Sequence, residues 1–193
     1  MCRLLGRVAV ATLVLAFLGS AQAQERGVQT GVKKVPAMTV AYKVQTSTFE
    51  DAGKVIPVTL RELLTAARDN GLHPLGYVVL RVQMDAPPVP GEAIRWELWL
   101  PIADAPQPDD LKPQAVVLVK QVEQTPVAFT YHLGPIEQLQ ETFMDLVTWA
   151  MGRGVDLTGE ARLITYGQLE ETKLQEMVWE CQLGTQGQLP AGL

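Results

Sequence analysis

Cysteine and histidine are scarce in this sequence: each occurs only twice among 193 residues. Cys2 falls in an N-terminal segment that we expect to be removed, which leaves Cys181 without a partner for an internal disulfide. His73 and His132 are isolated in the sequence, so the residues of a Cys/His zinc cluster are lacking. We therefore expect neither a bound metal nor a cofactor, and we interpret His132 as a structural turn residue rather than an axial ligand to haem.

Serine and positive charge are also in short supply. Beyond residue 23 the only serine is Ser47, which lies outside any Gly-x-Ser-x-Gly motif, so a serine hydrolase is not expected. The Gly152-Arg153-Gly154 segment follows a predicted helix instead of preceding one, unlike a phosphate-binding loop. Acidic residues outnumber basic ones by 21 to 16, for a net charge of −5. This balance argues against nucleic acid as a partner.

One long apolar run is present, and it lies at the N-terminus. Arg3 and Arg7 precede the apolar residues 8–18, and the small residues of 19–23 follow. This order is typical of a Sec signal peptide, and the run is too short for a membrane span of about 20 residues. We predict cleavage after Ala23, which leaves 193 − 23 = 170 residues in a secreted or periplasmic protein that is not embedded in a membrane.

A Trp-Glu motif occurs twice, within residues 95–100 and within residues 178–183. Neighbouring side chains of a strand point to opposite faces, so Glu97 shares a face with Trp99, and Trp96 lies on the other face. Glu180 is placed like Glu97. A glutamate in a strand this apolar either lies at the wet surface of a sheet or lines a hollow in it.

The motif belongs to a longer internal repeat. Apolar residues at helical spacing in 60–67 recur in 143–150, an offset of 83 that also relates Gly71 to Gly154 and Trp96-Glu97 to Trp179-Glu180. Upstream of the helices the offset is 87, because the loop predicted from Gln45 to Pro57 is longer in the first half. The predicted organisation is a signal peptide (1–23), a flexible lead-in (24–31), repeat one (32–102), a linker (103–113), repeat two (114–184) and a disordered tail (185–193).

Each repeat is predicted to form a β-α-β-β unit, with strands at 38–44, 76–84 and 94–102 in the first half. One such unit alone would have a marginal core, whereas two fused units can share one. We therefore predict an α+β fold in which a single curved antiparallel sheet carries two helices on one face. The other face is left as a ligand groove along the pseudo-twofold axis, where we expect Glu97 and Glu180 to approach each other.

Several segments resemble the GyrI-like effector-binding family, which includes the ligand domains of AraC-type regulators such as Rob. The resemblance rests on the 132–137 segment His-Leu-Gly-Pro-Ile-Glu, the helix 143–149, the opening strand 32–42 and the closing Trp179-Glu180 strand. It implies a domain that binds small, often cationic and aromatic molecules in the groove between the repeats. An acidic residue and aromatic walls would hold the ligand. A signal peptide stands where such a regulator would have its DNA-binding module.

The predicted function is therefore small-molecule binding, for cationic or aromatic hydrophobic ligands. A carboxylate in an apolar groove loses hydration, and an incoming cation offsets that penalty while an aromatic ring adds a cation–π contact. The candidate ligand-binding residues are Glu97, Trp99, Tyr131, Tyr166 and Glu180. The alternative reading of the two glutamates is structural: each pairs with Arg81, Arg95 or Arg162 and only solvates a sheet face.

Two other functions stay open. Some proteins that resemble this one hydrolyse strained or alkylating compounds, and in such an enzyme Glu180 or Glu97 would act as general base for water. The groove would otherwise bind a segment of a protein partner. We expect binding without catalysis, and we expect Cys181 to be a small buried group rather than a nucleophile.

Overall fold

The computed structural model describes residues 29–84, 91–104, 117–134, 138–166 and 178–187. The predicted signal peptide lies outside these residues, as do most of the predicted lead-in, linker and tail. Within the described ranges, neither helix combines the length and the apolarity that a membrane span requires.

The two repeats are visible as two runs of the same elements. The first half contains β1 (Gly31–Val35), β2 (Met38–Ser47), α2 (Phe49–Asp69), β3 (Tyr77–Gln83) and β4 (Ile94–Ile102). The second half contains β5 (Leu118–Val122), β6 (Thr125–Leu133), α3 (Leu139–Gly152), β7 (Leu157–Tyr166) and β8 (Val178–Thr185). Each half thus has one strand more than the predicted β-α-β-β unit. In the first half the predicted strand 32–42 is divided at Pro36, which has no N–H to donate to a neighbouring strand.

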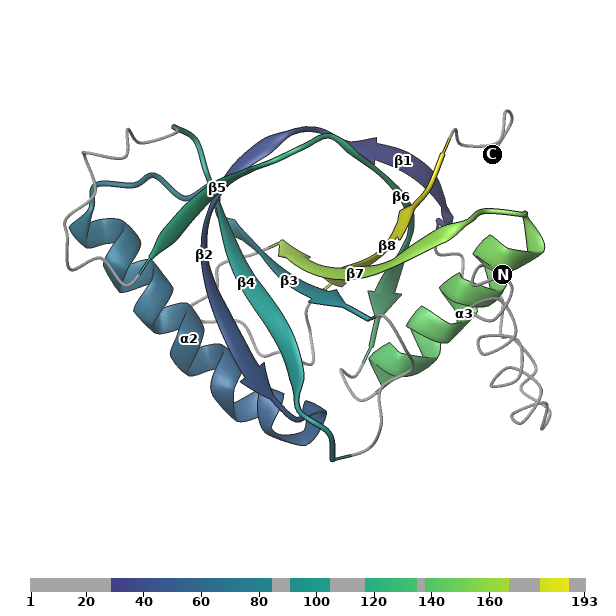
Figure 1. Cartoon of the computed structure of the whole chain (residues 1–193), viewed down its shortest axis with the longest axis horizontal. Helices are drawn as coiled ribbons and strands as arrows, with labels where there is room; N and C mark the ends of the chain where they lie inside the picture. Colours follow the sequence, from purple (N-terminus) through teal and green to yellow (C-terminus); the bar gives the residue numbers. More distant parts are fainter. Residues whose placement is uncertain (1–28, 85–90, 105–116, 135–137, 167–177, 188–193) are drawn as a thin grey trace, which may run out of the picture.

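All the described strands join one antiparallel sheet in the order β1-β6-β8-β7-β3-β4-β2-β5. Figure 1 shows this sheet as a curved half-barrel with α2 and α3 on its outer side. The predicted α+β fold with one curved sheet and two helices on one face is confirmed. The halves also exchange their first strands, because β1 pairs with β6 and β5 pairs with β2.

The core lies between the sheet and the helices. Trp96, Leu98 and Leu100 of β4 pack with Leu63 and Ala67 of α2. The second half repeats this arrangement with residues of β8 and α3, namely Trp179, Cys181, Leu183, Leu146 and Ala150. The predicted alternation of β4 and β8 is therefore confirmed, and it leaves Glu97 and Glu180 on the face opposite the helices.

The predicted loop from Gln45 to Pro57 is wrong, because α2 already begins at Phe49 and contains Pro57. The Thr48 hydroxyl caps the helix by accepting a hydrogen bond from the Asp51 backbone N–H. Val55 and Ile56 pack against the core and stabilise the first turns. This tertiary packing overrides the low helix propensity of Gly53 and Pro57.

Candidate ligand-binding site

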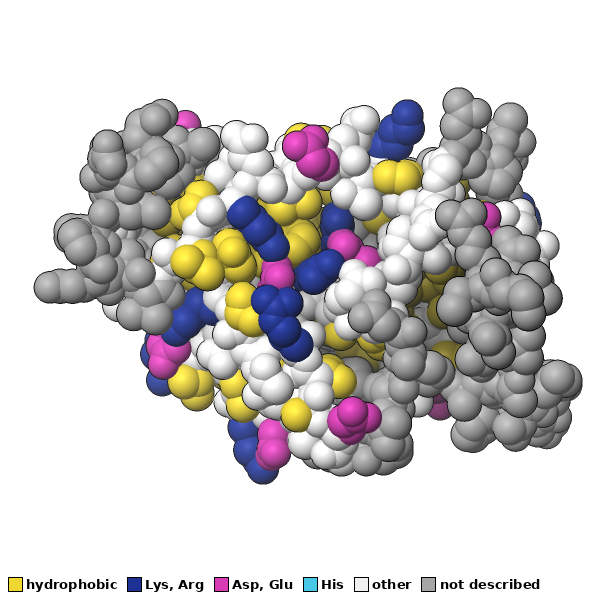
Figure 2. All heavy atoms as spheres, viewed as in Figure 1, with side chains coloured by type: hydrophobic (Ala, Val, Ile, Leu, Met, Phe, Trp, Pro, Cys, Tyr) yellow, Lys and Arg dark blue, Asp and Glu magenta, His cyan; other side chains and the backbone are white. Residues whose placement is uncertain are grey.

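The concave face of the sheet, which the helices leave free, has an apolar floor. Val40, Val79, Trp99 and Ile164 are buried together on it. Figure 2 shows Lys and Arg side chains gathered near the middle of the face seen in Figure 1, over hydrophobic side chains. The concave face therefore combines the apolar surface that was predicted for the groove with a set of charged side chains.

Glu97 lies on this face and is only 6% exposed. Its Oε2 atom accepts a hydrogen bond from Trp99 Nε1 at 2.6 Å and another from Lys120 Nζ, and Arg81 Nη1 lies 3.7 Å from Oε1. Burial alone would raise the pKa of Glu97, but the hydrogen bonds from Lys120 and Trp99 and the two positive charges together hold that pKa below its ordinary value. The carboxylate is thus buried and charged.

Glu180 is 1% exposed and is equally well paired. Its Oε1 atom lies 2.5 Å from Lys33 Nζ and accepts a hydrogen bond of 2.5 Å from Gln182 Nε2. The Tyr166 hydroxyl donates to Oε2 at 2.9 Å. Burial, followed by the charge of Glu180, raises the pKa of Tyr166, so that this hydroxyl stays a donor.

The two lysines occupy equivalent positions in the duplication. Lys33 and Lys120 are 87 residues apart, which is the offset of the upstream part of the repeat, and each reaches the glutamate of the opposite half from an exchanged edge strand. Lys120 Nζ lies 4.3 Å from the ring centre of Tyr42 and 4.6 Å from that of Trp99, and Lys33 Nζ lies 4.6 Å from that of Phe129. Each carboxylate therefore has a cation and an aromatic face beside it.

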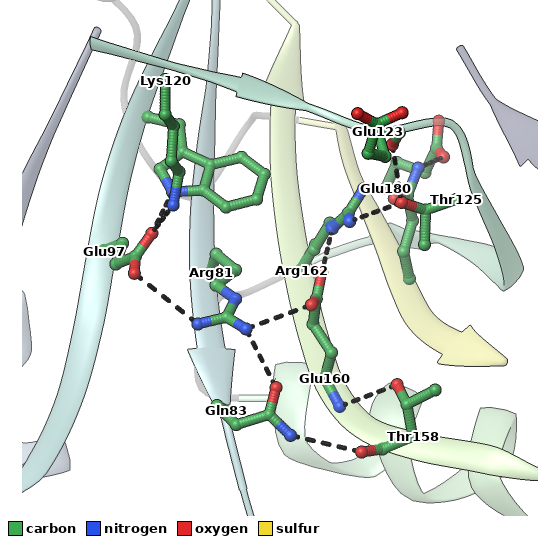
Figure 3. Close-up of polar contacts among 12 residues, drawn as sticks. Arg81, Gln83, Glu97, Lys120, Glu123, Thr125, Thr158, Glu160, Arg162 and Glu180 are labelled. Atoms are coloured by element: carbon green, nitrogen blue, oxygen red, sulfur yellow. Dashed lines mark hydrogen bonds and ion pairs between the residues drawn. The ribbon is translucent and has the colours of Figure 1, made fainter. Parts of the chain in front are cut away.

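The two glutamates do not meet, contrary to the sequence prediction. Strands β7 and β3 lie between β8 and β4, and they carry Arg162 and Arg81 directly opposite each other. Glu160 bridges these arginines, at 2.5 Å from Arg162 Nε and 3.2 Å from Arg81 Nη2 (Figure 3). The prediction failed because the pseudo-twofold axis passes between β3 and β7, whereas each glutamate lies on a strand farther from it.

The predicted ligand-binding residues form two groups. Glu97 contacts Trp99, and Glu180 contacts Tyr166. Tyr131 lies directly across from Glu180 on β6, half-buried, with its ring edge-on to Phe129 at 5.9 Å. The structural alternative, in which each glutamate pairs with an arginine, is confirmed in part, because Arg81 lies near Glu97. The main ion-pair partners of the two glutamates are lysines. The duplication had placed Lys33 and Lys120 at equivalent positions, and that signal could have identified them.

A pocket of about 840 Å³ opens on this face. Lys33, Tyr166 and Gln182 line it, and these are the three side chains that bond Glu180. Tyr77 adds a second aromatic wall, with its ring centre 5.7 Å from that of Tyr166. Glu180 thus lies directly behind the lining of the pocket, whereas Glu97 and Trp99 are not part of that lining.

The remaining sequence-predicted groups lie away from the pocket. His132 is a buried residue of strand β6 rather than of the predicted turn, and its Nδ1 lies 2.7 Å from the Thr142 hydroxyl of α3. Cys181 is fully buried on the helix side, and burial, with a smaller effect of the Glu180 charge, raises its pKa to about 12. Among the described residues, no three His, Cys, Asp or Glu side chains are grouped closely enough to hold a metal ion.

No protein-family model and no curated protein sequence matches this chain. Solved structures do match, among them the following three. The EcmrR C-terminal domain is 19% identical with a TM-score of 0.66, over 82% of this chain and 98% of that one. SAV2435 bound to tetraphenylphosphonium is 9% identical with a TM-score of 0.53, over 82% and 94%. A hydrolase from Listeria innocua is 12% identical with a TM-score of 0.56, over 80% and 91%.

The chain shares their fold. At these identities the likeness extends to the fold alone, and the activity of each neighbour belongs to that protein. The architecture implied by the GyrI-like resemblance is nevertheless the one observed.

Proposed function

We propose that this chain is a GyrI-like small-molecule-binding protein that holds an aromatic hydrophobic ligand, neutral or cationic, in the concave-face pocket. The observation that carries the proposal is the pocket itself, which combines two tyrosine walls with the hydrogen-bonded Glu180 behind its lining. Its volume of about 840 Å³ is within the usual range for small-molecule sites, about 300 to 1,000 Å³.

The lining fits an aromatic ligand. Tyr77 and Tyr166 present their rings beside the apolar side chains of Met38, Val122 and Ile164. An aromatic ligand gains from both the burial of apolar area and the ring contacts. The neighbour SAV2435 was solved with tetraphenylphosphonium, an aromatic cation, and this supports the ligand class by analogy of fold.

The hydrolase alternative finds support in the Listeria innocua neighbour, which is described as a hydrolase. The local chemistry favours binding instead. A general base needs a free oxygen and a pKa near the working pH, whereas Glu97 has a lowered pKa and Glu180 is held by three protein groups. We also propose a location outside the cytoplasm, on the signal-peptide pattern of residues 1–23, and no binding of nucleic acid. Binding of a protein partner's segment in the groove is the other alternative.

Tryptophan fluorescence tests the proposal. Trp99 lies on the concave face, whereas Trp96 and Trp179 belong to the helix-side clusters and Trp149 packs against one of them. Titration with small aromatic compounds is expected to give a saturable change in the tryptophan fluorescence. The expected Kd is about 1 μM, which corresponds to a binding free energy of roughly −8 kcal/mol. Replacing Tyr166 with Ala is expected to weaken binding by about tenfold or more, because it removes a pocket wall.

Tyr131→Ala is the matched control, since this tyrosine lies near Glu180 but does not line the pocket. Its Kd is expected to stay within about twofold of the wild-type value. A folded protein that gives no saturable response, or an equal loss of affinity in both variants, would contradict binding in this pocket.

A further inference from the structure

We infer that Lys33 and Lys120 are built-in occupants of two cation sites, and that an external organic cation reaches Glu180 by displacing Lys33 from the pocket wall. The inference rests on the proposed function and extends it, because it names the residue that sets the selectivity between neutral and cationic ligands.

The surroundings of each lysine are those that recognise an organic ammonium ion. A buried carboxylate supplies the opposite charge, and aromatic rings supply negatively polarised faces. Lys120 has Glu97, Tyr42 and Trp99 around its ammonium group. Lys33 has Glu180 and Phe129. In both places the cation comes from the protein itself.

The same site is built twice, which argues that the pairing is a property of the repeat. Tyr42 and Phe129 are 87 residues apart, as the lysines are, and the two glutamates are 83 apart. A second donor to the carboxylate is also retained: Trp99 Nε1 in the first half and Gln182 Nε2, at the equivalent position, in the second. The chemistry is thus conserved between the halves even where the side chain differs.

The exposed fractions of the side chains indicate which member of each lysine–glutamate pair can move away. The side chains of Lys33 and Lys120 are 34% and 30% exposed, whereas the side chains of their glutamates are 1% and 8% exposed. Each lysine therefore stands between its carboxylate and the solvent. Lys33 also lines the pocket, so its rotation toward solvent would open Glu180 to the pocket. Lys120 is not part of that lining, so rotation of its side chain would not open Glu97 to this pocket.

Selectivity follows from this arrangement. A neutral aromatic ligand can use the tyrosine walls while Lys33 remains on Glu180. A cation of the same shape must compete with an ammonium group that is tethered beside the carboxylate at a high effective concentration. The resting protein is thus selective against cations, and loss of the Lys33 charge is expected to reverse this selectivity.

The test compares benzyltrimethylammonium with neopentylbenzene, its neutral isostere, by calorimetric titration. Lys33→Met is expected to lower the Kd for the cation by about tenfold or more and to leave the Kd for the neutral probe within about twofold. Lys43→Met is the matched control: it removes a strand lysine that is paired with Glu62 of α2, on the other face of the sheet. It should change neither Kd. Lys33→Arg keeps the charge and should gain no affinity for the cation.

Folding of each variant is checked by near-ultraviolet circular dichroism, because Lys33→Met leaves Glu180 without its counter-ion. Lys33→Gln is the second variant, since an amide can still donate a hydrogen bond to the carboxylate, and it should show the same change. The double variant Lys33→Met with Glu180→Gln leaves no unpaired charge at this site. It should lose the affinity for the cation that Lys33→Met gains, and it should keep its affinity for the neutral probe.

An unchanged or weaker cation affinity in folded Lys33→Met and Lys33→Gln would overturn the displacement inference. If the wild type still bound neopentylbenzene in a manner sensitive to Tyr166→Ala, the proposed function would survive that result. If neither the wild type nor the lysine variants bound either probe, both the inference and the proposed function would be overturned.

Discussion

At the residue scale, Glu97 keeps its charge in a buried position because two hydrogen bonds and two positive charges surround it. The structure lowers its pKa below the ordinary value of 4.5. A carboxylate whose pKa is lowered by folding stabilises the folded state above its unfolded pKa. That stabilisation is lost as the pH falls through the lower, folded pKa. Acid is therefore expected to weaken this half of the sheet.

The corresponding prediction concerns Glu97→Gln. We expect it to reduce the free energy of unfolding by about 1 to 3 kcal/mol at pH 7, because the charged hydrogen bonds are lost. The difference from the wild type should shrink as the pH is lowered toward about 3, below the ordinary pKa. Urea unfolding across this pH range measures it. Glu62→Gln, at the exposed end of the Lys43 pair, should cost less than about 1 kcal/mol at every pH. A pH-independent cost for Glu97→Gln would contradict the account.

At the element scale, α2 contains a residue that is unfavourable in a helix. Pro57 is exposed in the helix interior, where it has no N–H for the carbonyl of Gly53. We expect Pro57→Ala to raise the free energy of unfolding by about 1 to 3 kcal/mol, because a backbone hydrogen bond is regained and no buried packing is lost. Thermal and urea unfolding would show this gain. A loss of stability would mean that the helix depends on the proline for its path over the sheet.

The same elements show how far the sequence could predict the fold. The alternation of apolar and polar residues placed Glu97 and Trp99 on one face of β4 and Trp96 on the other, because this pattern is local. The start of α2 was missed because Gly53 and Pro57 are poor helix formers, and only contacts with the distant core make their segment helical. The pairing of Lys33 with Glu180 was missed because it depends on the exchange of β1 onto the second half.

At the scale of the whole molecule, the exchange of β1 and β5 ties the two repeats together. Each half supplies an edge strand, and with it a lysine, to the other half. The pseudo-twofold axis passes between β3 and β7, so the centre of the concave face is occupied by the cluster of Arg81, Glu160 and Arg162 rather than by the two glutamates. The sequence predicted the duplication, but strand order across the axis is a tertiary property that the repeat alone does not determine.

The central claim is that the concave-face pocket holds an aromatic ligand, and a crystal structure of the complex tests it most directly. Crystals would be grown with tetraphenylphosphonium, using wild-type protein and the Lys33→Met variant. We expect phenyl rings against Tyr77 and Tyr166 in both, with the Lys33 ammonium moved away from Glu180 in the wild type. Ligand density elsewhere, or a saturated complex in which Lys33 still contacts Glu180 and the tyrosines touch no ligand, would contradict the account.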